Sequence, residues 1–115
     1  MKKGEITIRY MQRYLLRKQN QYDCTNDTKM CFIKLAEEVG ELARIMLRGE
    51  KQATGPDDLK DTLEEELYDI LYYTLAFANA KNIDLETWIP VKEKINNERY
   101  PSGIEFDPTD DSVFE

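Results

Sequence analysis

The stretch EEELYDILYYTLAFANA, residues 64–80, decides the fold class of this chain. From residue 67 to residue 78 its only charged side chain is Asp69, which stands among leucine, isoleucine, tyrosine and phenylalanine. A helix that is apolar on nearly all sides is typical of the centre of an assembly. A lone carboxylate in such a helix is costly unless something satisfies it. The sequence therefore predicts a partner for Asp69.

Three further segments carry helical patterns, at residues 6–19, 28–48 and 85–99. Gly49 is well placed to stop the second of them. The helix that contains the opening stretch is expected to span about residues 59–81, with Asp57 or Asp58 as its N-cap. The only strand candidate is weak and lies at residues 5–8. These patterns predict an all-α bundle of three or four helices.

Two apolar stripes are predicted to form the core of the bundle. The stripe on the helix at residues 28–48 consists of Phe32, Leu35, Ala36, Val39, Leu42, Ala43 and Met46. The stripe on the helix of the opening stretch consists of Leu63, Leu67, Ile70, Thr74 and Phe77. By length, residues 1–100 are predicted to form a single domain that oligomerisation completes. The acidic tail, residues 101–115, is predicted to be loop or disordered.

Composition excludes several classes of function. The 16 basic and 23 acidic residues give a formal net charge of -7, which argues against nucleic acid or an anionic membrane as a partner. No apolar run reaches the length that a bilayer requires, and we expect a cytoplasmic protein. Its two cysteines, Cys24 and Cys31, are expected to be free thiols. The absence of histidine removes the usual zinc sites and the usual di-iron carboxylate motif.

Four carboxylates lie in two pairs on two helices. Glu66 and Asp69 are separated by three residues and lie close to the apolar face, whereas Glu65 points elsewhere. Glu38 and Glu41 have the same separation on the preceding helix, where a solvated acidic face explains them equally well. Helices joined by a short connector tend to pack antiparallel, which would bring the two pairs together. Such a cluster persists only with cations, because like charges repel.

Oxygen ligands without histidine or cysteine select a hard cation, with Mg²⁺ first and Mn²⁺ or Ca²⁺ next. Mg²⁺ held by carboxylates keeps coordination positions that phosphate oxygens occupy. The chemistry that the four acids most naturally imply is therefore metal-assisted attack of water on a phosphate chain.

The two acidic pairs and their context resemble a known family. Glu38-Val-Gly-Glu41 followed by Glu66-Leu-Tyr-Asp69 is similar to the E-x-x-E and E-x-x-D signature of the MazG-like, all-α nucleoside triphosphate pyrophosphohydrolases. The end of the last helix resembles the K-x-x-x-N-x-x-R-Y-P ending of that family, with matches at Lys92, Asn96, Arg99, Tyr100 and Pro101. The resemblance covers about residues 34–101.

The resemblance implies an activity and an assembly. Glu38, Glu41, Glu66 and Asp69 would coordinate Mg²⁺, with Mn²⁺ as a substitute. The reaction would split a nucleoside or deoxynucleoside triphosphate into monophosphate and pyrophosphate, with housecleaning of the nucleotide pool as one role. Members of the family build their sites in dimers, often paired into tetramers, so a homodimer or homotetramer is expected.

Further residues are candidates for roles around the metal. Glu37 or Glu38 would orient or deprotonate the attacking water, although Glu37 is equally well explained as an exposed helix acid. The candidates for substrate binding are Lys92, Asn96, Arg99 and Asn79. Lys92 and Arg99 would bind the triphosphate or else support their own helix, and Asn79 would contact sugar or base.

Two alternatives stand beside this function. One is a sibling activity on the same fold, such as a dUTP, dCTP or phosphoribosyl-ATP pyrophosphohydrolase. The other is a helical oligomer without enzymatic activity, in which the acids are structural or regulatory cation ligands.

Overall fold

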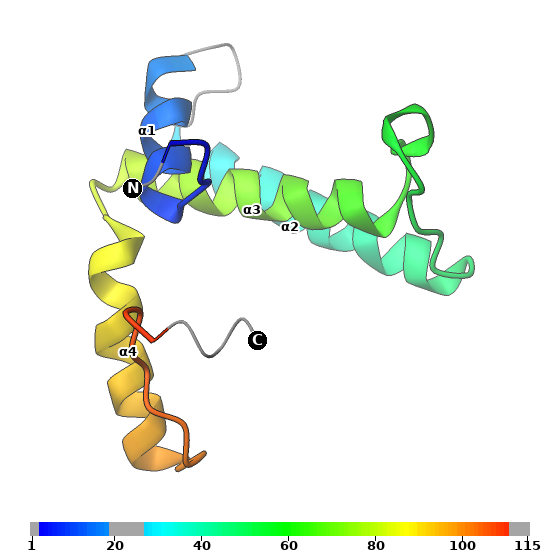
Figure 1. The fold of residues 1–115 in the computed structure, drawn as a ribbon. Coiled ribbons are helices and arrows are strands. Elements are labelled where there is room, and N and C mark those ends of the chain that lie inside the picture. The colour runs from blue at the N-terminus through cyan, green and yellow to red at the C-terminus, as the bar shows by residue number, and fades with distance from the viewer. Residues whose placement is uncertain (1–2, 19–26, 111–115) are drawn as a thin grey trace. The chain divides into compact units, whose positions relative to one another are not determined.

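The computed structural model describes residues 3–18 and 27–110, and these residues contain helices and no strand. The helices are α1 (Ile8–Lys18), α2 (Thr28–Leu47), the short 3-10 helix η1 (Pro56–Asp58), α3 (Leu63–Ala80) and α4 (Leu85–Arg99) (Figure 1). The all-α prediction is confirmed. The weak strand candidate at residues 5–8 is wrong, because Ile8 already begins α1. No helix of the described residues is long and apolar enough to cross a bilayer.

The chain divides into two compact units, Met1–Ile83 and Asp84–Glu115. The second unit contains α4, and none of the residues of α4 is buried. Residues 101–110, which follow α4, form no helix. The predicted boundary between a single domain and a tail near residue 100 stays a prediction.

The first unit is organised around α3. Helices α2 and α3 lie side by side and run antiparallel, as expected, and α1 packs against α3 (Figure 1). Asp27 caps α2 by accepting a hydrogen bond from the main-chain nitrogen of Met30 at 3.0 Å. The predicted stop after α2 lies at Gly49, whose φ of 118° suits a residue without a side chain.

The start of α3 differs from the expectation. The helix begins at Leu63 and its N-cap is the fully buried Thr62, whose Oγ1 accepts from the main-chain nitrogen of Glu65 at 3.3 Å. Asp58 instead stabilises the connector, because its carboxylate accepts from the Thr54 hydroxyl at 2.7 Å and from the Gly55 nitrogen at 2.9 Å. The hydrogen bond from the Thr54 hydroxyl, with those from the main chain, lowers the pKa of Asp58. A carboxylate bound in this way is not available as the cap of α3.

The predicted core stripes are partly wrong. Phe32, Val39 and Met46 of α2 and Leu67 of α3 are at least half exposed, and the fully or nearly buried apolar residues are Leu15, Cys31, Ile45, Leu75 and Ala78. The reason for α2 is that α3 is the only helix among the described residues that packs extensively against it, so its other apolar side stays exposed there. Cys31 is disulfide-bonded, so the expectation of a free thiol is wrong for this residue. Cys24 lies outside the described residues.

Candidate functional site

Three carboxylates from two helices meet in the first unit. Glu38 of α2 and Glu66 and Asp69 of α3 each offer an oxygen atom, and these atoms lie within 4.8 Å of one another. The separation of three residues places Glu66 and Asp69 on one side of α3, and the antiparallel packing of α2 brings Glu38 to that side. The predicted pairing of acids across the two helices is therefore present for three of the four residues.

Glu66 is the buried member of this acidic cluster. Its side chain is 5% exposed, and its Oε2 atom is buried without a hydrogen-bond partner among the described residues. Burial, a hydrogen bond with Glu38 and the charges of Glu38, Asp69 and Glu65 raise the pKa of Glu66 to about 8. A buried carboxylate oxygen without a partner is rare in proteins, and a bound cation would satisfy it.

Asp69 lies in the same electrostatic environment. Burial raises its pKa, and the charges of Glu38 and Glu65 add to that rise. Glu65 thus contributes to the site, although the sequence indicated an ordinary solvated residue. Glu65 lies four residues before Asp69, and residues at this separation are neighbours on a helix. This spacing could have predicted the influence of Glu65 on Asp69.

A divalent cation fits these residues. The donors are carboxylate oxygens from three side chains, which is the ligand type that Mg²⁺, Mn²⁺ and Ca²⁺ prefer. The positive charge would offset the mutual repulsion that raises the pKa values, and the ion would satisfy the buried oxygen of Glu66.

Glu41 and Glu37 lie outside this cluster. Glu41 forms an ion pair with Arg44, three residues further along α2. Glu37 forms an ion pair with Lys34 at 3.4 Å, and its side chain is 56% exposed. Both acids would have to leave these surface partners to reach a bound ion or its substrate.

Asn79 is committed to the contact between α1 and α3. Its Oδ1 accepts from Nε2 of the buried Gln12 at 3.0 Å, and its Nδ2 donates to the Gln12 main-chain oxygen at 2.9 Å. Lys92, Asn96 and Arg99 lie on α4 in the second unit, where Lys92 and Arg99 are exposed.

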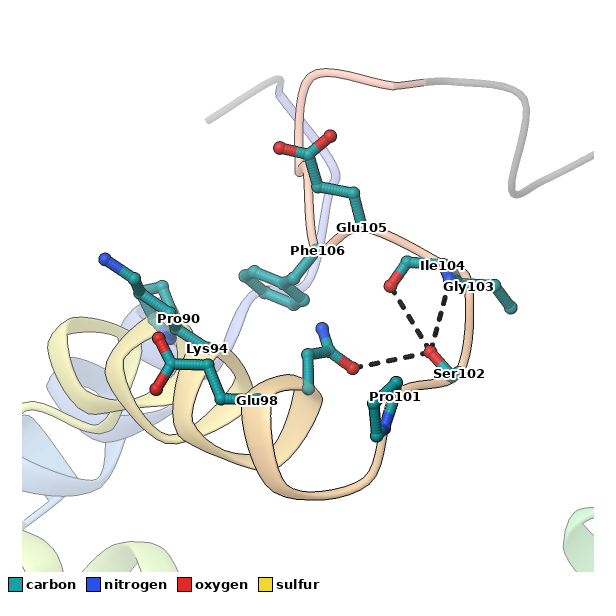
Figure 2. A pocket seen from close by; sticks show the side chains of 10 residues that line it. Pro90, Lys94, Glu98, Pro101, Ser102, Gly103, Ile104, Glu105 and Phe106 are labelled. Atoms are coloured by element: carbon teal, nitrogen blue, oxygen red, sulfur yellow. Dashed lines mark hydrogen bonds between the residues drawn. The ribbon is translucent and has the colours of Figure 1, made fainter.

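A cavity of about 560 Å³ lies in the second unit, between α4 and the chain that follows it (Figure 2). Pro90, Lys94 and Glu98 line it on the helix side, and Pro101, Ile104 and Phe106 line it on the other. None of the predicted site residues belongs to its lining. The carboxylate cluster of the first unit, and not this cavity, is therefore the candidate for chemistry.

Tyr68 of α3 interacts with the charge of one cluster residue, Asp69. Burial raises the pKa of Tyr68, the charge of Lys18 opposes this rise, and the charge of Asp69 adds to it. The Tyr68 hydroxyl is thus close enough to both charges to be influenced by them. Neither Tyr68 nor Lys18 was a candidate from the sequence.

Comparison with known proteins agrees with this geometry. A family model described as the MazG nucleotide pyrophosphohydrolase domain matches residues 28–103. No curated protein matches the chain. Two crystal structures of iMazG from Vibrio DAT 722 are similar to it. The N-terminally tagged form is 32% identical with a TM-score of 0.71, covering 84% of this chain and 99% of that one. The C-terminally tagged form is 33% identical with a TM-score of 0.70, covering 80% and 99%.

The matched residues include the whole acidic cluster, because Glu38, Glu66 and Asp69 all lie between residues 28 and 103. The match also covers α2, α3 and α4 from end to end. The chain belongs to the MazG nucleotide pyrophosphohydrolase family, whose members are hydrolases acting on nucleotide phosphoanhydride bonds.

Proposed function

We propose that this protein hydrolyses nucleoside or deoxynucleoside triphosphates to the monophosphate and pyrophosphate, with Mg²⁺ as cofactor and Mn²⁺ as a substitute. The observation that carries the proposal is the buried, unpartnered oxygen of Glu66 beside the carboxylates of Glu38 and Asp69. Within a family of nucleotide pyrophosphohydrolases, an oxygen-only cation site is best explained by the triphosphate chain.

Glu38, Glu66 and Asp69 would hold the metal ion, and Glu41 would join them after leaving Arg44. When bound, Mg²⁺ neutralises charge on the phosphates and makes the phosphorus easier to attack. The rigid pairing of α2 and α3 holds these carboxylates in place before substrate arrives.

A carboxylate of α2 orients the attacking water and accepts its proton. Glu38 lies in the cluster, whereas Glu37 lies outside it and is held only by an exposed ion pair with Lys34. The turnover number of Glu37→Gln separates these two candidates, because an unchanged rate leaves the role to Glu38.

Four further residues are proposed to bind the substrate. Lys92 and Arg99 would bind the triphosphate through charge-assisted hydrogen bonds, with Asn96 on the same face of α4. Asn79 would contact sugar or base only after its hydrogen bonds to Gln12 open.

A second copy of this chain is proposed to cover the exposed apolar side of α2, in a homodimer or homotetramer. Phe32, Val39 and Met46 recur every seven residues along that side, and each is at least half exposed. This spacing forms the kind of stripe that packs against another helix.

We propose a cytoplasmic role in clearing unwanted nucleotides from the pool.

The test is a panel of nucleoside and deoxynucleoside triphosphates incubated with Mg²⁺, with separate detection of pyrophosphate, orthophosphate and monophosphate. The panel includes dUTP, dCTP and phosphoribosyl-ATP, which separates the sibling activities. Equal release of pyrophosphate and monophosphate is expected. Orthophosphate as the first product, or no product from any nucleotide, would contradict the proposal.

A further inference from the structure

Lys18 bridges α1 and α3 in the first unit. Its ammonium nitrogen lies 5.7 Å from the ring centroid of Tyr14 on α1 and 5.5 Å from that of Tyr72 on α3. Both distances lie within the range of cation–π attraction. The Tyr72 ring makes edge contacts with Tyr68 and Tyr73, at centroid distances of 6.3 and 5.3 Å. A long and exposed lysine side chain is thereby restricted to one place.

Tyr68 connects that place with the acidic cluster, because the charges of Lys18 and Asp69 both act on its hydroxyl group. Tyr72 follows Asp69 by three residues, so it is the neighbour of Asp69 on the next turn of α3. The charges that raise the pKa values of Glu66 and Asp69 are those of neighbouring carboxylates. A phosphate chain approaching this surface meets the three carboxylates of the acidic cluster and needs positive charge in addition to a metal ion. Lys18 is a cation of the same compact unit, and it contacts the ring of Tyr72, which follows Asp69 by one turn of α3.

We propose that Lys18 binds the phosphate chain of the substrate and that Tyr14 and Tyr72 position its ammonium group. An ammonium group has three hydrogen-bond donors and no acceptor, which suits phosphate oxygens. Lys18 precedes the residues that the family model matches, so this contact belongs to the chain's own first helix. The assignment rests on the proposed function, since it concerns the same substrate.

Kinetics of three variants test the assignment. Lys18→Met removes the charge and keeps the length, Lys18→Arg keeps the charge, and Arg17→Met is the matched control, because Arg17 is the other basic residue in the last turn of α1. We expect Lys18→Met to raise KM for the triphosphate about tenfold or more, with a smaller change in kcat. Lys18→Arg should recover most of that loss, and Arg17→Met should resemble the wild type.

The role of the rings has its own test. Tyr72→Leu should raise KM in the same direction as Lys18→Met, and Tyr72→Phe, which keeps the aromatic face, should rescue it. Thermal unfolding of every variant identifies changes that act only through the packing of α1. A lower Tm with an unchanged KM in Lys18→Met would assign Lys18 to stability alone and overturn the proposal.

Calorimetric titration with Mg²⁺ and pyrophosphate gives a readout that does not require turnover. Weaker pyrophosphate binding by Lys18→Met, about tenfold, is expected, with no change in Arg17→Met. If the wild type hydrolyses triphosphates but Lys18→Met changes neither KM nor pyrophosphate affinity, the Lys18 assignment fails and the proposed function stands. If no triphosphate is hydrolysed but pyrophosphate binding depends on Lys18, the proposed function fails and the phosphate contact stands.

Discussion

Gln12 and Asn79 join α1 to α3 through hydrogen bonds in both directions. Nε2 of Gln12 donates to Oδ1 of Asn79 at 3.0 Å, and Nδ2 of Asn79 donates to the main-chain oxygen of Gln12 at 2.9 Å. The same Nε2 also donates to the main-chain oxygen of Ile83 at 2.8 Å. Two amide side chains thus fix α1 where α3 ends.

Removing either amide is expected to loosen this contact. Gln12→Ala and Asn79→Ala should each lower the free energy of unfolding by about 1–3 kcal/mol, because each leaves a partly buried group without its partner. The double variant should lose less than the sum of the two losses. Urea denaturation measures all three. A rise in KM for Asn79→Ala without one for Gln12→Ala would instead place Asn79 at the nucleoside.

Asp69→Asn is expected to lower Mg²⁺-dependent hydrolysis by more than about 100-fold, because it removes a proposed ligand. The metal-free variant should be as stable as the wild type or more stable, since repulsion within the cluster is relieved. Asp57→Asn, the same change at an exposed residue of η1, is the control. Full activity of Asp69→Asn would remove the residue from the site.

The raised pKa of Glu66 predicts how the stability of the metal-free protein depends on pH. The pKa is about 8 in the folded chain against an ordinary value of 4.5. The folded state therefore binds more protons between these values, so stability is fully present below 4.5 and is lost as pH rises through about 8. Urea midpoints in a chelating buffer should fall over this interval, and Glu66→Gln should flatten the decline.

Mg²⁺ should oppose that loss. The ion binds the carboxylate form, so its stabilising effect is expected to increase with pH over the same interval. Parallel denaturation curves with and without Mg²⁺ measure the effect. If the urea midpoint of the metal-free protein declined equally with pH in the wild type and in Glu66→Gln, a group other than Glu66 would be responsible for the loss of stability.

Arg44 is expected to compete with the metal for Glu41. Arg44→Met should raise Mg²⁺ affinity by up to about fivefold, because it removes an exposed ion pair of modest strength. Lys34→Met is the matched control, since it frees Glu37, another acid three residues from its basic partner. Calorimetry with Mg²⁺ measures both variants. An equal gain in both would indicate a general effect of charge, not release of Glu41.

The apolar side of α2 should control assembly. Val39→Glu places a charge in the middle of the exposed stripe and is expected to produce monomers, because burying an unpaired charge between helices is costly. Light scattering after size-exclusion chromatography measures the mass. Ile6→Glu, at a more exposed apolar residue outside α2, should leave the mass of the wild type unchanged. A monomeric wild type would contradict the proposed assembly.

Helical periodicity was sufficient to predict that each α-helix exists, but not where every helix begins. The range of α4 was predicted correctly, because Asp84 and Pro101 mark its two ends and Pro90 within it does not break the helix. The start of α3 was not predicted correctly. Whether Asp58 or Thr62 caps this helix depends on hydrogen bonds in and beside the connector. The exposed apolar residues of α2 were assigned to a core because periodicity does not show whether the covering surface belongs to the same chain.

The candidate site was predictable where it depends on helix geometry. Glu38, Glu66 and Asp69 come together through spacing on α3 and antiparallel packing with α2. The pairing of Glu41 with Arg44 was also readable, since these residues are three apart. The contact between Lys18 and Tyr72 could not be predicted from the sequence. This contact depends on how α1 crosses α3, and no local sequence pattern determines that crossing.

The buried cap Thr62 fixes the residue at which α3 begins, and so fixes where the carboxylates of α3 lie along the helix. The register of Glu66 and Asp69 is set within the first two turns that follow Thr62, and the connector is tied to the same turns by hydrogen bonds from the Leu63 nitrogen to the Lys51 oxygen and from the Ala53 nitrogen to the Glu64 carboxylate. Related chains are therefore expected to differ in length between Ala53 and Thr62, where a change leaves these two hydrogen bonds and the positions of the acids intact. A search for related enzymes that fixes the distance in sequence between the two acidic pairs would miss such proteins, whereas one that aligns each pair to its own helix would find them.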